Sequence, residues 1–74
     1  MVIIYVLVVT EVGKENEIAK ELSKIKGVTE AKTVYGEFDV VARIEAENLK
    51  EVDEIITTVR KVSGIIRTVT LISA

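Results

Sequence analysis

The sequence predicts an α+β protein of the ferredoxin-like, split β-α-β type, with its elements in the order βαββαβ. Apolar, β-branched runs near both ends of the chain indicate strands, and two stretches with apolar residues three and four positions apart indicate helices. Gly27 and Gly64 lie 37 residues apart, half of the 74-residue chain, and similar residues flank both. Two interleaved β-α-β halves form a four-stranded antiparallel sheet with both helices on one face.

The first half begins with the longest apolar run, Val2–Val9. Because this run has no polar alternation, it is predicted to be a central strand that is buried on both faces. Lys14–Lys26 is predicted to be a helix from its apolar periodicity, and Gly27 is expected to follow its C-terminal cap.

Two strands are predicted on either side of a glycine turn in the middle of the chain. Val28–Tyr35 mixes β-branched and charged residues, which is typical of an edge strand. Gly36-Glu37 is expected to turn the chain tightly, because glycine takes a positive φ without steric cost, and Phe38–Glu45 to return as the second strand of a hairpin. The apolar face of that second strand is predicted to carry Phe38, Val40, Ala42 and Ile44.

The second half repeats the pattern of the first. Leu49–Ser63 is predicted to be a helix, with Asn48 as its N-cap and Gly64 after its end. Ile65–Ile72 is predicted to be the last strand. The apolar stripe of the helix is expected to contain Leu49, Val52, Ile56 and Val59, widened by Ile55 and Val62.

Two helices cover only one face of such a sheet, yet Val2–Val9 is apolar on both sides. An exposed apolar face of this size is typical of an association surface. We therefore predict a homodimer, formed by stacking sheet on sheet or by extending sheet edges. A small chain without disulfides or metal sites also gains stability from such assembly.

The composition excludes several function classes. The chain has no cysteine or histidine, which removes disulfides, thiolate or imidazole metal sites and histidine-based catalysis. The net charge is −2 and no basic patch is present, so direct DNA binding is not expected. The N-terminal apolar run is too short for a membrane span or a signal peptide, which predicts a cytoplasmic protein. Abundant Lys and Glu with no Cys also fit a thermophile.

Glu37 and Asp39 are the most suggestive pair of polar residues, because carboxylates two positions apart share one face of a strand. A solvated acidic hairpin tip that protects a sheet edge is the better explanation of the pair, and no phosphate loop, metal cluster or basic–aromatic RNA-binding strand accompanies it. The chain is therefore predicted not to be an enzyme and to use no cofactor.

A binding site for a free amino acid is the better interpretation. Backbone N–H groups at Gly36 would meet a carboxylate, and Asp39 would meet an ammonium group. Thr68 and Thr70 in the last strand are further candidates, although β-propensity alone also explains them. Arg43 and Arg67 are expected to be solvated or paired at an interface rather than to bind a ligand.

The order βαββαβ, the step Gly36-Glu37-Phe38-Asp39 preceded by an aromatic residue, and the ending Gly64-Ile65-Ile66-Arg67-Thr68-Val69-Thr70 resemble the effector-binding (RAM) domain of the Lrp/AsnC transcriptional regulators. The resemblance covers Val2 to Ile72. It implies a fold of the dimeric α/β barrel type, with dimers that stack through their sheets and assemble further into rings such as octamers.

The resemblance also implies an amino-acid effector bound at interfaces between dimers. Its contacts would come from Tyr35, Gly36 and Asp39 at the hairpin, and from Thr68 and Thr70 of a neighbouring subunit. Because Met1 is followed directly by the first strand, we expect a stand-alone form without the family's helix-turn-helix. Such a module would modulate transcription through full-length Lrp/AsnC partners.

Two other interpretations remain. The ACT domain has the same order of elements and also senses amino acids, usually through a glycine-containing loop after the first strand, where this chain has Gly13. The third possibility is a structural or adaptor oligomer that binds no small ligand and in which Gly36 and Asp39 only form a turn.

Overall fold

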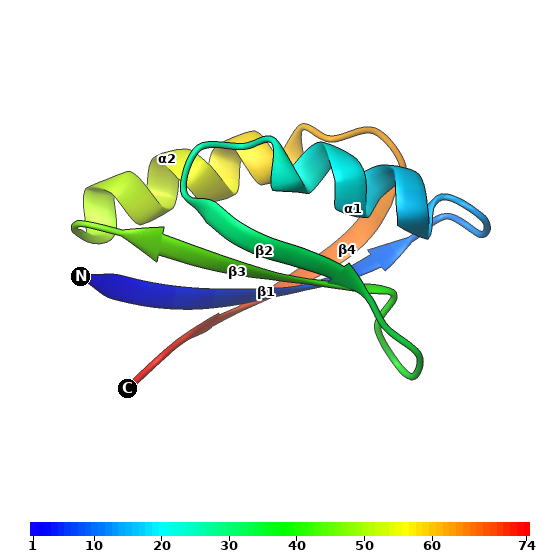
Figure 1. Cartoon of the computed structure of the whole chain (residues 1–74), viewed down its shortest axis with the longest axis horizontal. Helices are drawn as coiled ribbons and strands as arrows, with labels where there is room; N and C mark the ends of the chain where they lie inside the picture. The colour runs from blue at the N-terminus through cyan, green and yellow to red at the C-terminus, as the bar shows by residue number, and fades with distance from the viewer.

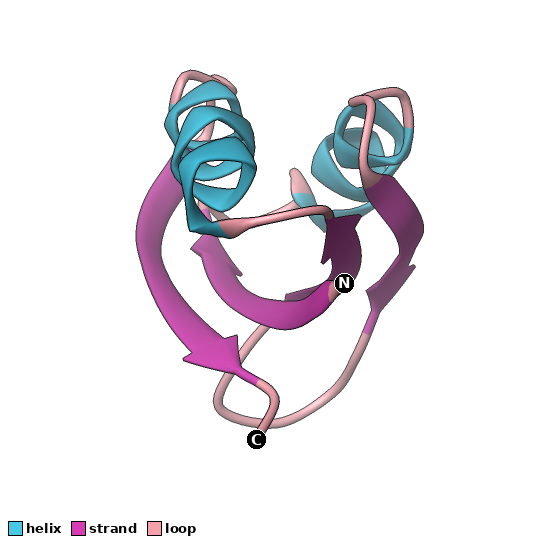
Figure 2. Ribbon diagram, turned by 90° about the vertical axis from the view of Figure 1, so that its left-hand side faces the viewer, coloured by secondary structure: helices cyan, strands magenta, loops and turns pink.

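The computed structural model describes all residues, 1–74, and has the expected element order βαββαβ. The sheet order is β2-β3-β1-β4 with every pair antiparallel, so β1 is central as predicted and β3 is the other central strand. Both helices lie side by side on one face of a strongly curved sheet (Figure 1, Figure 2). The elements are β1 (Val2–Thr10), α1 (Glu15–Ser23), β2 (Val28–Thr33), β3 (Val40–Ala46), α2 (Leu49–Arg60) and β4 (Ile65–Ile72).

The core lies between the helices and the inward face of the two central strands. Alternation in β1 and β3 turns every second residue toward the helices, and cross-strand pairs such as Ile4–Ile44 and Val8–Val40 are fully buried. Leu49 was expected in the core stripe but is 65% exposed, whereas Val52, Ile55 and Val59 are buried as predicted. Leu49 is the first residue of α2 and therefore lies at the margin of the helix layer. The largest fully buried side chains are Ile4, Ile18, Leu22, Ile44, Val6, Val8, Val40 and Val59.

Both helices end three residues earlier than predicted. The C-cap positions are Lys24 and Lys61, and Gly27 and Gly64 therefore lie three residues beyond the caps rather than directly after them. Both glycines have positive φ, of 99° and 97°. The Gly27 carbonyl accepts a hydrogen bond from the Glu45 N–H on β3, and the Gly64 carbonyl accepts one from the Glu11 N–H just after β1. The Asn48 prediction is confirmed, since its side chain accepts a hydrogen bond of 2.9 Å from the Glu51 backbone N–H.

The predicted tight hairpin is wrong. β2 ends at Thr33 and β3 begins at Val40, which leaves a six-residue loop, residues 34–39, closed by a hydrogen bond of 2.9 Å from the Val34 N–H to the Asp39 carbonyl. Phe38 does not join the inward apolar face. The loop bends away from the helix layer (Figure 1), and the Arg67 guanidinium carbon lies 5.6 Å from the centre of the Phe38 ring.

Neither helix is long and apolar enough to cross a membrane.

Candidate functional site

Asp39, the last residue of the loop of residues 34–39, is held in place by the neighbouring central strand β1. Its backbone N–H donates to the Val8 carbonyl at 2.8 Å, and its Oδ2 accepts from the Thr10 N–H at 2.9 Å. The carboxylate therefore satisfies a backbone donor at the end of a central strand, which is a structural reason for an acid at this position. The other carboxylate oxygen, Oδ1, makes no hydrogen bond within the chain.

A hollow of about 410 Å³ lies beside Asp39, between the loop of residues 34–39 and the β1–α1 connection. Figure 1 shows both connections at the same end of the sheet, opposite the chain termini. Two of the lining side chains, Glu15 and Asp39, are carboxylates, and no Lys or Arg lines the hollow. The size is that of a small-ligand site. The lining residues are Thr10, Val12, Gly13, Glu15, Asn16, Thr33, Val34, Tyr35 and Asp39.

The structure thus brings together two of the five residues that were predicted to bind a ligand. Tyr35 is fully exposed at the rim of the hollow, and Asp39 lines its wall. Gly36 has the positive φ that its turn requires, 124°, but does not line the hollow, and nothing lies within 4 Å of the position a Cβ would take.

Thr68 and Thr70 lie elsewhere within the single chain. Their partners across the β1–β4 pair are Val8 and Val6, whose side chains face the helices, so both threonines also lie on the helix side. Strand β1 separates them from β3 and from the loop of residues 34–39.

The β1–α1 connection is the wall of the hollow that the sequence prediction did not include. Val12, Glu15 and Asn16 lie more than 15 residues from Asp39 in the sequence, and only the antiparallel pairing of β1 with β3 brings them close. The one sign of this wall in the sequence is Gly13, a glycine that marks a turn after the first strand and has a φ of 82° in the structure.

The second surface with functional potential is the face of the sheet that the helices leave open. We call it the open face. Tyr5 and Leu71 on this face are 39% and 48% exposed, and the other apolar members are half-buried. The first strand was predicted to be buried on both faces, but within one chain only its helix side is buried. Burial of the other face would require contact with another molecule. The apolar residues of the open face are Ile3, Tyr5, Leu7, Val9, Val41, Val69 and Leu71.

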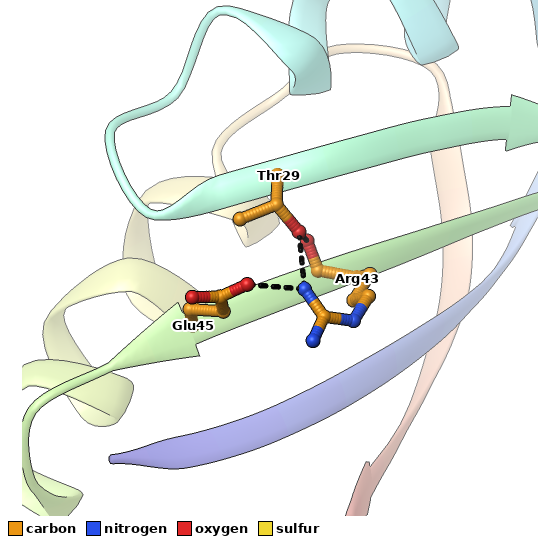
Figure 3. Close-up of polar contacts among 3 residues, drawn as sticks. All are labelled: Thr29, Arg43 and Glu45. Carbon is orange, nitrogen blue, oxygen red and sulfur yellow. Dashed lines mark hydrogen bonds and ion pairs between the residues drawn. The ribbon is translucent and has the colours of Figure 1, made fainter.

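Arg43 and Glu45 form an ion pair on the open face, on the central strand β3. Arg43 Nη1 donates to a Glu45 carboxylate oxygen and, at 3.0 Å, to the Thr29 hydroxyl on β2 (Figure 3). The pKa of Arg43 is raised above its ordinary value, first by the hydrogen bond to Glu45 and then by the nearby Tyr5 side chain. The guanidinium carries its positive charge in any case, because arginine is not deprotonated in proteins.

The fold defines a class of protein: small α+β modules with the element order βαββαβ and two helices on one face of a four-stranded antiparallel sheet. Within this class the identification is direct, since residues 3–74 match the model of the Lrp/AsnC ligand-binding domain. The chain belongs to this family, as the sequence resemblance predicted. The family consists of regulatory ligand-binding domains, which agrees with the prediction that the chain is not an enzyme.

Known relatives support the assignment. The crystal structures of FFRP-DM1 and of hypothetical protein PHS023 from Pyrococcus horikoshii are both 40% identical to the chain, with a TM-score of 0.93. The match covers the whole of this chain in both cases, all of FFRP-DM1 and 90% of PHS023.

Longer proteins contain a similar segment. The HTH-type transcriptional regulator PF0250 of Pyrococcus furiosus is 38% identical over 60 residues, which is 80% of this chain. The chain spans 40% of the length of that curated relative. The feast or famine regulatory protein of M. tuberculosis, solved in complex with L-methionine, shares the fold at 17% identity and a TM-score of 0.79, and the match covers 99% of this chain and 50% of that one.

Proposed function

We propose that the protein is an amino-acid-sensing regulatory module that binds a free amino acid in the hollow beside Asp39. The observation that carries the proposal is the position of Tyr35 and Asp39, two residues singled out from the sequence, on the hollow of a Lrp/AsnC ligand-binding domain. Asp39 Oδ1 is available for the ligand's ammonium group, and such charge-assisted hydrogen bonds are among the strong ones.

The site is completed by assembly. In one chain the hollow is open to solvent, and the side chains of Val12 and Tyr35 at its rim are fully exposed. We propose that copies pair through their open faces, and that dimers associate further, so that a neighbouring copy closes the hollow. Thr68 and Thr70 of that neighbour remain the proposed additional contacts.

The output of the module is proposed to be transcriptional, through association with full-length Lrp/AsnC regulators. The similarity to a segment of the HTH-type regulator PF0250 supports this, because a domain of the same family can join the assembly of such a protein through the same surfaces.

Titration calorimetry with each of the twenty amino acids tests the binding proposal. We expect at least one to bind, and we expect Asp39→Asn to weaken that binding by about tenfold or more, as the loss of a charge-assisted bond would. Asparagine keeps an oxygen for the Thr10 N–H, so the fold is retained. The control is Glu37→Gln, which removes the same charge from an exposed residue outside the hollow. If none of the twenty binds at millimolar concentration, the sensor proposal is wrong.

A structural or adaptor oligomer without a small ligand is the second candidate. The hydrogen bond from the Thr10 N–H to Asp39 favours it, because this bond explains the acid without any ligand. Under this alternative Asp39→Ala lowers the thermal stability, while assembly responds to no amino acid.

A further inference from the structure

The polar residues of the open face point to a specific role in assembly, which rests on the dimer proposed above. Arg43 lies on a central strand, between the apolar side chains of β1 on one side and the charged edge strand β2 on the other, and its cross-strand neighbours on that face are Tyr5 on β1 and Glu30 on β2. A charge in the middle of an apolar association surface is costly when the surface is covered, unless a partner pairs with it.

The bonds that Arg43 makes within the chain leave part of its guanidinium free. Its ion pair with Glu45 and its bond to Thr29 both use Nη1, and Nη2 points away from these two partners (Figure 3). Arg43 and Glu45 are each still 34% exposed at the side chain. Covering the open face removes the water that solvates them, so the covering molecule has to supply an acceptor to Arg43 and a donor to Glu45.

A second copy of the same chain meets both requirements. The open face carries three basic and two acidic residues, so it has no strong charge of one sign that would favour an acidic or a basic partner. In a two-fold symmetric dimer, if residue i of one copy contacts residue j of the other, then residue j of the first copy also contacts residue i of the second. The charged residues are Glu30, Lys32, Arg43, Glu45 and Arg67.

We propose that Arg43 of each copy pairs with Glu45 of the other across the stacked sheets, and that these reciprocal pairs determine which chains are accepted as partners. The intrachain bond between the two residues holds them in position before the copies meet. Chains that place like charges at these two positions are rejected, because like charges across a covered face repel one another with no water to screen them.

Charge-reversed variants mixed in pairs test the proposal. Arg43→Glu alone and Glu45→Arg alone each place like charges opposite one another, and we expect the dimer dissociation constant of each to rise by about tenfold or more. An equimolar mixture restores opposite charges, and we expect a mixed dimer near wild-type affinity by sedimentation velocity and native mass spectrometry. Circular dichroism checks that each variant is folded. The matched controls are Lys20→Glu on α1 and Glu54→Arg on α2, both exposed, which should leave the dimer unchanged.

The outcomes separate this proposal from the dimer itself. If the wild type is a monomer, the dimer and the pairing are both wrong. If the wild type is a dimer and the reversed variants dimerise equally well, or if folded variants do not recover on mixing, only the pairing is wrong. If a reversed variant fails to fold, the salt dependence of the wild-type dimer decides between the two cases. Reciprocal ion pairs predict a dimer dissociation constant that rises with salt concentration, and a purely apolar contact does not.

Discussion

Gly27 lies so close to Ile55 that a Cβ atom on the glycine would be 2.4 Å from the isoleucine Cδ1. Gly64 stands in the same relation to Ile18, at 3.0 Å. The two pairs are related by the 37-residue repeat. Gly64 lies 37 residues after Gly27, and Ile18 lies 37 residues before Ile55. Each half of the chain therefore places the glycine that follows its helix against the helix of the other half, so the two halves depend on each other for packing.

This relationship predicts that Gly27→Ala is strongly destabilising. The substitution adds a Cβ at a φ of 99° and also presses on Ile55, which together should lower the free energy of unfolding by about 2–4 kcal/mol. Gly36→Ala is the matched control, because its φ is also positive but no atom lies within 4 Å of the new Cβ. It should cost only about 1–2 kcal/mol. Urea unfolding at one fixed protein concentration measures both, and equal losses would show that the close approach to Ile55 has no energetic weight.

Much of the fold was predictable because its signals are local. The apolar runs of β1 and β4 and the glycine at each helix exit mark the elements to within a few residues. The helix ends were placed too late because Ile25 and Val62 continue the apolar periodicity. Both side chains pack against the core from the turn that follows the helix. Periodicity reports which residues face the core and not where the helical hydrogen bonds stop.

The candidate site was predictable only in part, because contacts between residues far apart in the sequence form it. Tyr35 and Asp39 were found from a short motif, but the bond that fixes Asp39 joins it to Thr10, 29 residues away. That long-range bond holds residue 39 against β1, at the end of a six-residue loop rather than in a tight turn. The wall formed by the β1–α1 connection follows from the same strand pairing, which no local pattern reports.

The N-cap of α2 gives a second prediction on stability. Asn48→Ala removes the side-chain oxygen that accepts the Glu51 N–H and should lower the free energy of unfolding by about 1 kcal/mol. Asn16→Ala serves as the control, because Asn16 is exposed in α1 and its side chain makes no hydrogen bond within the chain. Thermal unfolding followed by circular dichroism distinguishes the two. An equal effect of both substitutions would contradict the capping role.

The open face predicts how the dimer responds to a single charge. Leu7→Lys places an ammonium group on the middle of that face, on the central strand β1, where a second copy would bury it. The expected result is a folded monomer at concentrations at which the wild type is a dimer, measured by sedimentation velocity. Leu49→Lys, which alters a leucine that is 65% exposed at the start of α2, should remain dimeric. A dimer that tolerates Leu7→Lys would mean that the copies do not meet through the open face.

The charges around the hollow predict which amino acids are accepted. Glu15 and Asp39 line it and no cationic side chain does, so the ligand's ammonium group is stabilised while a second carboxylate on the ligand is repelled. Among the amino acids that bind, we therefore expect neutral or basic ones to bind more tightly than aspartate and glutamate. Glu15→Gln should reduce this discrimination, while Glu17→Gln, on the same helix but outside the hollow, should leave it unchanged. Competition calorimetry with glutamate against its neutral counterpart glutamine gives the ratio directly, and a preference for glutamate would place the ligand away from these two carboxylates.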